Sequence, residues 1–291
     1  MRVTTGLVCL WFAACGPQPR SHPIPIDGDS GSGGSWFDGA VATPCRHIDL
    51  VIAVDNSASM RQEKDDLRDV AFPALANAML NIAGGIDDFR VGVVDGCNTP
   101  ANFHTNGYIN GVSGSCNFVG GEPWMESSSP NLVNEFKCVG DVDSSDMLCT
   151  GENDDEQPAS AAATALEPLW AGPGKPNEGF MRSNALLVVV AITDEDEDPV
   201  PGASAQEVYE RLVAIKGDVD KMVFVGIGGN QTCDGLYGHA REAMKLRRIT
   251  QNFIDEGRGV FWDICQGNIE QGLTQALTTI ESACEDFGPI L

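Results

Sequence analysis

The sequence from residue 49 to residue 59 reads Asp49-Leu50-Val51-Ile52-Ala53-Val54-Asp55-Asn56-Ser57-Ala58-Ser59. The aliphatic run over 50–54 predicts a β-strand that is buried on both faces. Directly after it, one carboxylate and two hydroxyls lie in a single turn, those of Asp55, Ser57 and Ser59. Open α/β sheets bind ligands at this end of their strands, and hard oxygens suit Mg²⁺, Mn²⁺ or Ca²⁺. As an alternative, Asp55 or Ser57 only caps the helix that follows.

The rest of the chain alternates predicted strands with predicted helices. Further strands are predicted over 88–95, 185–194, 222–227 and 260–264, and helices over about 60–82, 156–170, 204–216, within 239–256 and from 269 onward. Pro73 lies inside the first of these helices and is expected to kink or interrupt it. The alternation predicts an α/β fold, in which a doubly wound, mostly parallel central sheet has helices on both faces.

A second predicted strand also ends in an acid. The run over 185–192 is strongly apolar and leads into Thr193-Asp194. In a parallel sheet the ends that carry Asp55 and Asp194 should be neighbours. Asp-x-Ser-x-Ser at the first end and Thr-Asp at the second resemble the first and third motifs of the metal-ion-dependent adhesion site of von Willebrand factor A (VWA) domains.

The resemblance covers about residues 46–287 and implies a Rossmann-like fold that binds Mg²⁺, or else Mn²⁺ or Ca²⁺. The ligands that it implies are Asp55, Ser57, Ser59 and Asp194. The sequence departs from the family where Glu195 follows in place of the usual Gly. The acids from 195 to 198 are expected to repel an acidic ligand around the rim of the site.

The family's second motif supplies a Thr from the loop before a helix, and Glu156 occupies that position here. A Glu is longer than a Thr and carries charge. We therefore expect Glu156 to ligate the cation directly and to take the place that a partner's carboxylate would otherwise use. In the alternative, Glu156 points to solvent and caps its helix.

In the resembled family the domain binds rather than catalyses. The chain is therefore expected to be a cell-envelope protein, not an enzyme, that binds an unidentified protein partner or mediates adhesion with the help of a divalent cation. One alternative is a structural envelope domain with a vestigial metal site. A less favoured alternative is a metal-dependent phosphoryl hydrolase of haloacid dehalogenase type with Asp55 as nucleophile, because that chemistry needs a second acid where Ser57 stands.

The N-terminus carries export signals. Arg2, a short apolar run over 7–12 and the small residues before Cys15 predict a signal peptide over 1–14. Ala-Ala-Cys-Gly resembles a bacterial lipoprotein processing box, which implies that Cys15 is lipidated and that the protein is exported, anchored to the membrane by its lipid alone and faces the periplasm or cell surface. The alternative is an ordinary secretion signal. Residues 15–44 are rich in Gly, Ser and Pro and predict a flexible tether, and residues 45–291 are expected to form the domain that resembles VWA domains.

Eight further cysteines follow in the domain, and an even number behind an export signal predicts disulfides. They are Cys45, Cys97, Cys116, Cys138, Cys149, Cys233, Cys265 and Cys284. Cys45 precedes the first strand and Cys284 ends the last helix. Because the ends of doubly wound domains often lie close and some VWA domains bridge theirs, these two are expected to pair. The four cysteines over 97–149 are expected to pair among themselves.

The segment over 97–150 is an insert rich in Gly, Asn and Ser, and it is expected to be irregular and held by its cysteines. Asp141-x-Asp143-x-Ser145 with Glu152 partly resembles a calcium-binding loop, although Asp146 stands where such a loop needs Gly. The whole chain has a formal charge of −24. Such a charge repels nucleic acid and anionic lipid head groups, so neither is an expected partner.

Overall fold

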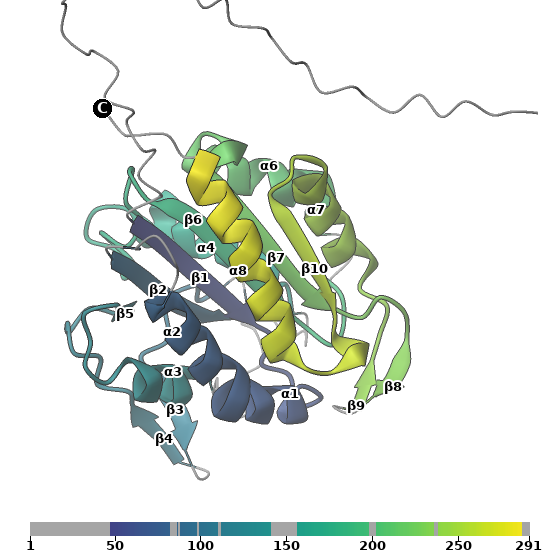
Figure 1. Ribbon diagram of the computed structural model, residues 1–291, viewed down its shortest axis with the longest axis horizontal. Helices are drawn as coiled ribbons and strands as arrows, with labels where there is room; N and C mark the ends of the chain where they lie inside the picture. Colours follow the sequence, from purple (N-terminus) through teal and green to yellow (C-terminus); the bar gives the residue numbers. More distant parts are fainter. Residues whose placement is uncertain are drawn as a thin grey trace, which may run out of the picture. The chain divides into compact units, whose positions relative to one another are not determined.

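A six-stranded sheet forms the centre of the fold (Figure 1). Its strand order is β10 (Gly259–Asp263), β7 (Met222–Gly228), β6 (Leu186–Ile192), β1 (His47–Val54), β2 (Asp88–Asp95) and β5 (Met125–Glu126). The first five strands are parallel, and the short edge strand β5 pairs antiparallel with β2. The predicted mostly parallel α/β sheet is confirmed.

The fold is that of a computed structural model. The described residues are 47–81, 86, 88–97, 99–109, 112–140, 156–197, 202–235 and 238–286, and they belong to one unit that spans Val41–Leu291. The expected signal peptide, Cys15 and the tether lie outside the described residues, and so does the segment over 141–155 with its partial calcium-loop pattern. Among the described helices, none is long and apolar enough to cross a bilayer.

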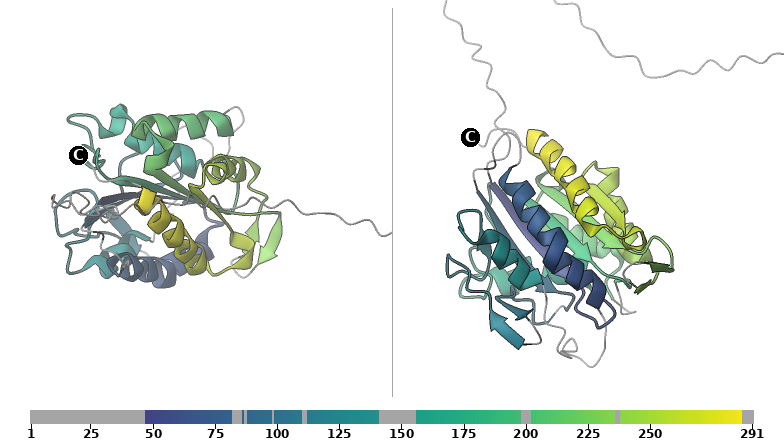
Figure 2. Two further views of the ribbon diagram at one scale, coloured as in Figure 1. Left: turned by 45° about the horizontal axis from the view of Figure 1, so that its top comes forward. Right: turned by 60° about the horizontal axis from the view of Figure 1, so that its bottom comes forward.

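Helices cover both faces of the sheet (Figure 2). One face carries α1 (Arg61–Asp66), η1 (Leu67–Ala71), α2 (Phe72–Leu80), α3 (Leu132–Gly140) and α8 (Ile269–Asp286), and the other carries α4 (Pro158–Leu166), α6 (Ala205–Lys216) and α7 (Met244–Asp255). Three single turns complete the helical elements: α5 (Pro168–Ala171), η2 (Val219–Lys221) and η3 (Ile264–Gln266). Alternate residues of β1 enter the two cores, Leu50 and Ile52 the first and Val51 and Ala53 the second. β1 is therefore buried on both faces, as its apolar sequence predicts.

The first helix is interrupted close to Pro73, as predicted. α1 passes into the π-helical segment η1, and α2 then begins with Pro73 in its first turn. Proline has no backbone N–H to donate to the preceding turn, and a wider π turn accommodates that loss. The interruption leaves Phe72 fully buried against the sheet.

The insert has more regular structure than its composition predicts. It contains the hairpin of β3 (Asn106–Ile109) and β4 (Val112–Ser115) as well as α3. The expectation of an irregular segment is wrong here, because the apolar residues Leu132, Phe136 and Val139 recur at helical spacing and bury α3 against the core. The ring of Phe136 meets that of Phe72 edge-on, with 5.9 Å between centroids.

Disulfides join the insert and a second hairpin to the domain. Cys116–Cys138 ties the end of β4 to α3, which confirms a pairing within the insert. Cys233–Cys265 ties the hairpin of β8 (Cys233–Gly235) and β9 (Gly238–Ala240) to η3. Cys97 and Cys284 are also disulfide-bonded. Cys45 and Cys149 lie outside the described residues, so the Cys45–Cys284 bridge stays a prediction.

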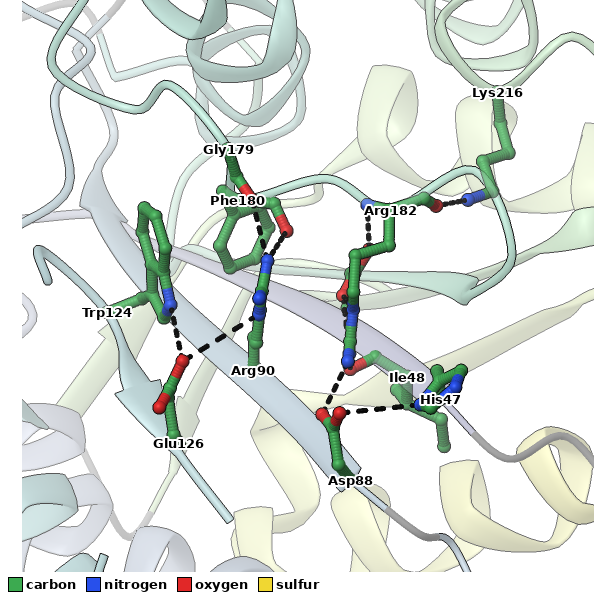
Figure 3. Close-up of polar contacts among 11 residues, drawn as sticks. His47, Ile48, Asp88, Arg90, Trp124, Glu126, Gly179, Phe180, Arg182 and Lys216 are labelled. Atoms are coloured by element: carbon green, nitrogen blue, oxygen red, sulfur yellow. Dashed lines mark hydrogen bonds and ion pairs between the residues drawn. The ribbon is translucent and has the colours of Figure 1, made fainter. Parts of the chain in front are cut away.

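A network of charged groups with the buried Asp49 at its centre joins the N-terminal ends of β1 and β2 to the loop before β6 (Figure 3). Asp49 is fully buried, and its carboxylate accepts hydrogen bonds from the backbone N–H and the Nε of Arg182 at 2.6 and 2.8 Å. The same guanidinium donates to Asp88 Oδ1 at 2.5 Å and to the Ile48 carbonyl at 2.9 Å. Burial raises the pKa of Asp49, and the contacts with Arg182 oppose that rise. Arginine thus offsets the buried carboxylate at this end of the sheet.

Arg90 of β2 holds the same loop at a second point (Figure 3). Its Nη1 donates to the carbonyls of Gly179 and Phe180 at 2.6 and 3.2 Å. The guanidinium also lies 5.5 Å from the ring centroid of Trp124, at cation–π distance. The loop that leads into β6 is therefore fixed on both β1 and β2, which sets where β6 begins.

Candidate metal centre

The strand order reverses between β1 and β6. From β1 the chain adds β2 on one side, and later β6, β7 and β10 on the other. Val54 of β1 lies opposite Ile192 of β6, and the Asp55 N–H donates to the Ile192 carbonyl at 2.9 Å. The two acidic strand ends are therefore neighbours at a topological switch point, where open α/β sheets bind their ligands.

A chain of hydrogen bonds links the polar side chains at these two ends, which we call the strand-end cluster: Asp55, Ser57, Ser59, Thr193 and Asp194. The Thr193 hydroxyl donates to Asp55 Oδ2 at 2.6 Å, and the Ser57 N–H donates to Asp55 Oδ1 at 2.8 Å. The hydroxyls of Ser57 and Ser59 lie 2.8 Å apart, and the Ser59 hydroxyl donates to Asp194 Oδ1 at 3.2 Å. The structure thus brings together the four residues that the first and third motifs imply as ligands, although their ligation of a cation stays a prediction.

Burial weakens the acidity of both carboxyl groups in the strand-end cluster. Asp55 and Asp194 are almost fully buried. Burial raises the pKa of Asp55, while the hydrogen bonds from Thr193 and Ser57 oppose the rise. For Asp194, burial first and then repulsion from Asp55 raise the pKa to about 7. A cation between the strand ends would favour the ionised forms of both groups.

Glu156 lies in the same region and is only 5% exposed. A Cβ atom placed on Gly96 would lie 3.0 Å from the Cβ of Glu156 and 3.4 Å from the Cα of Asp55. The Gln157 N–H also donates to the Gly96 carbonyl at 2.7 Å, which joins the start of α4 to the end of β2. Glu156 is therefore not directed to solvent, contrary to the alternative, and whether it ligates a cation stays a prediction.

Two of the acids that follow Asp194, Asp196 and Glu197, do not form part of the repulsive rim that we expected, whereas Glu195 does repel the Asp194 carboxylate. Asp196 caps α7, because its carboxylate accepts hydrogen bonds from the backbone N–H groups of Lys245 and Leu246. Glu197 is fully buried and caps α4 through the N–H groups of Ala159 and Ser160. The backbone N–H groups at helix N-termini lack partners within the helix and attract carboxylates. Both side chains therefore point toward these helix ends.

Glu195 is engaged as well, because its carboxylate lies 3.0 Å from Arg241 Nη1. The Arg241 N–H donates in turn to the Asp194 carbonyl at 2.7 Å. Asp198 lies outside the described residues. The charge at this part of the rim is thus partly balanced by arginine, which weakens the expected repulsion of an acidic ligand.

Sequence reasoning missed two buried charged residues of α1. Lys64 is buried, and its Nζ donates to the carbonyls of Asn56 and Ser57 at 3.0 Å each. Glu63, its neighbour, is also buried. A signal was present, since Lys64 lies four residues after the buried Met60 and three before the buried Leu67 and so falls on the core face of the helix. A charged residue at a core-facing position of a helix indicates that its charge interacts with polar groups inside the protein.

The donor set suits a hard divalent cation. Oxygen atoms of hydroxyl and carboxyl groups are the ligands that Mg²⁺, Mn²⁺ and Ca²⁺ prefer. Besides Glu197, four buried carboxyl groups lie around this end of the sheet, and the buried ammonium of Lys64 opposes the rise in pKa of Asp55 and Glu63. The four belong to Asp55, Glu63, Glu156 and Asp194. Within the described ranges, no three Asp, Glu, His or Cys side chains are close enough to enclose an ion by themselves. The serine hydroxyls would therefore have to share in the ligation.

Comparisons with known proteins leave the family open. No family profile matches the chain, and no curated protein matches it. Among solved structures, two crystal forms of proximal thread matrix protein 1 from the mussel byssus are similar, with a TM-score of 0.43 and 13% and 12% sequence identity. These alignments cover 84% of this chain and 49% and 48% of the mussel protein, so the chain spans about half its length.

Proposed function

We propose that this chain is a VWA-like binding domain whose contact with a protein partner depends on a divalent cation at the strand-end cluster. One observation carries the proposal: carboxyl groups are buried together at the switch point of the sheet, in excess of the buried positive charge beside them. Buried charge is unfavourable unless it is paired or coordinates a metal. A divalent cation would supply that pairing.

The residues of this chain would have separate roles in the site. Asp55, Ser57, Ser59 and Asp194 would hold the cation, and Glu156 would add a further carboxylate from the start of α4. The cation, when bound, is a Lewis acid that accepts an oxygen ligand from the partner. The backbone contacts of Lys64 with the loop at 56–57 keep the hydroxyls in place. We assign no enzymatic step to this site.

Calorimetric titration with Mg²⁺ tests the proposal. Wild type should bind, and Asp55→Ala and Asp194→Ala should both lose binding while their circular dichroism stays native, since neither change opens a cavity in the apolar core. Asp234→Ala is the matched control, because its side chain is 92% exposed on β8. If Asp194→Ala binds Mg²⁺ as wild type does, the two strand ends do not share a cation.

A structural domain with a vestigial metal site is the second candidate. The hydrogen bonds within the strand-end cluster favour it, because Thr193, Ser57 and Ser59 already satisfy part of the carboxyl oxygens. Under this alternative, wild type would show no heat of binding at millimolar Mg²⁺. The hydrolase alternative predicts phosphatase activity that Asp55→Ala abolishes.

We also propose that the chain is exported and held at the bacterial envelope by a lipid on Cys15. The disulfides Cys116–Cys138 and Cys233–Cys265 support export, because such bonds persist in oxidising compartments. Cys15→Ser should release the protein from the membrane fraction. An unchanged distribution in that variant would contradict the anchor.

A further inference from the structure

Glu63 is a buried carboxylate that the strand-end cluster does not account for. It lies in the first turn of α1, the helix that begins just after Ser59, and it is 2% exposed. Its Oε2 atom is buried and has no hydrogen-bond partner among the described residues. Leaving a carboxylate oxygen buried and unpaired is costly, so this side chain needs a partner of positive charge.

The charged groups around Glu63 show where that partner would lie. Burial raises the pKa of Glu63 to about 7, and repulsion from Asp194 and from Asp55 adds to the rise. Glu63 precedes Lys64 in α1, and the Nζ of Lys64 donates to the carbonyls of Asn56 and Ser57 at 3.0 Å each, so this part of α1 lies against the loop that carries the strand-end cluster. Lys64 opposes the rise, but its ammonium group is held by the carbonyls of Asn56 and Ser57. The orphaned oxygen therefore belongs to the same end of the sheet as the proposed cation.

Glu63 and the two aspartates do not together form a group that could hold an ion directly. In the part of the chain that the structure describes, no three acidic side chains gather closely enough to hold an ion among themselves. A carboxylate at such a position acts on a cation through its charge and through the hydration shell. This suits Mg²⁺, which dehydrates reluctantly and usually keeps several waters when a protein binds it.

We propose that Glu63 is an additional carboxylate of the cation site, which retains hydrated Mg²⁺ from outside the direct ligand set. The inference rests on the proposed function and deepens it. Groups that surround the direct ligands of a metal contribute strongly to its affinity. With Glu63 present, the domain keeps its cation before any partner arrives, so a partner need not bring an acidic side chain to complete the site.

The test compares wild type, Glu63→Gln and the control Glu281→Gln, which removes an exposed carboxylate on α8. Calorimetric titration with Mg²⁺ at pH 8 gives the affinity, and thermal unfolding in EDTA gives the stability without cation. Glu63→Gln should weaken Mg²⁺ binding about 10- to 100-fold. It should also raise the unfolding temperature in EDTA, because it removes repulsion with Asp55 and Asp194. A purely structural role predicts no loss of affinity.

Each outcome decides between the two proposals. If wild type binds Mg²⁺ and Glu63→Gln binds it equally well, the role of Glu63 is overturned while the proposed function stands. If wild type does not bind Mg²⁺, both are overturned. Should Glu63→Gln fail to fold, Glu63→Asp keeps the charge and withdraws the oxygen by one methylene. It should bind Mg²⁺ several-fold more weakly than wild type, and equal affinity would overturn the inference.

Discussion

The two ends of β1 bury carboxylates in opposite ways. At the N-terminal end, Asp49 receives hydrogen bonds from both the backbone and the guanidinium of Arg182. At the C-terminal end, the described hydrogen bonds to the Asp55 carboxylate come from Thr193 and Ser57, and a second acid, Asp194, lies beside it. At the first end an arginine binds the buried carboxylate directly, whereas at the second end the buried ammonium of Lys64 lies beside two buried aspartates and donates to the carbonyls of Asn56 and Ser57. A buried carboxylate alone therefore does not indicate a binding site. Buried carboxylates that outnumber the positive side chains around them do.

Removing the counter-charge at the first end should have the largest effect. Arg182→Met leaves Asp49 buried without its ion pair, and we expect a loss of about 3–5 kcal/mol in the free energy of unfolding, measured in urea. Arg68→Met is the matched control, because Arg68 pairs with exposed Asp65 and Asp69 at the surface and should cost about 1 kcal/mol or less. A loss at Arg182 no larger than at Arg68 would mean that the network contributes little.

Glu197 represents a third case, a buried carboxylate that caps a helix. Burial raises its pKa to about 7, against the opposing effect of the Ala159 and Ser160 N–H groups and of Lys245. Between the ordinary pKa of 4.5 and about 7, the folded protein therefore holds a proton that the unfolded chain has released. Stability from this group is fully present below about pH 4.5 and is lost as the pH rises to about 7.

Glu197→Gln should consequently flatten the pH dependence of the free energy of unfolding between pH 4.5 and 7, measured in EDTA. The slope should change by at most about 1.4 kcal/mol per pH unit. Glu281→Gln, an exposed change of the same kind, should leave the slope alone. Identical slopes in wild type and Glu197→Gln would show that the helix N-terminus keeps Glu197 ionised throughout this range.

The smallest effect is expected at the rim. Arg241 is 63% exposed and pairs with Glu195, and exposed ion pairs contribute between about 0 and 1 kcal/mol. Arg241→Gln should therefore change the free energy of unfolding by less than about 1 kcal/mol and shift Mg²⁺ affinity less than Glu63→Gln does. A larger shift in affinity would mean that the charge of Arg241, and not its backbone contact with Asp194, governs the site.

Much of the fold follows from local sequence, because apolar strands such as 50–54 and 185–192 can only be buried in a covered parallel sheet. The neighbouring strand ends follow from that topology. The insert was misjudged because a composition rich in Gly, Asn and Ser concealed the helical spacing of α3. The inward turn of Asp196 and Glu197 could not be predicted, since it depends on which helix N-termini lie opposite them. The burial of Lys64 and Glu63 could have been predicted, because both lie at helical spacing from apolar residues of the same helix.

Gly96 shows how a residue without a side chain can constrain its surroundings. A Cβ there would lie 3.0 Å from the Cβ of Glu156, so a side chain at this position would press Glu156 away from the cluster, while the Asp55 backbone at 3.4 Å would be in ordinary contact. Mutational tolerance at residue 96 should therefore be lower than at an open position such as Gly114, which has nothing within 4 Å of a Cβ, although Gly96 offers no chemical group. Among functional variants, this position should favour the smallest residues for reasons of space, and a survey that scores only reactive side chains would overlook it.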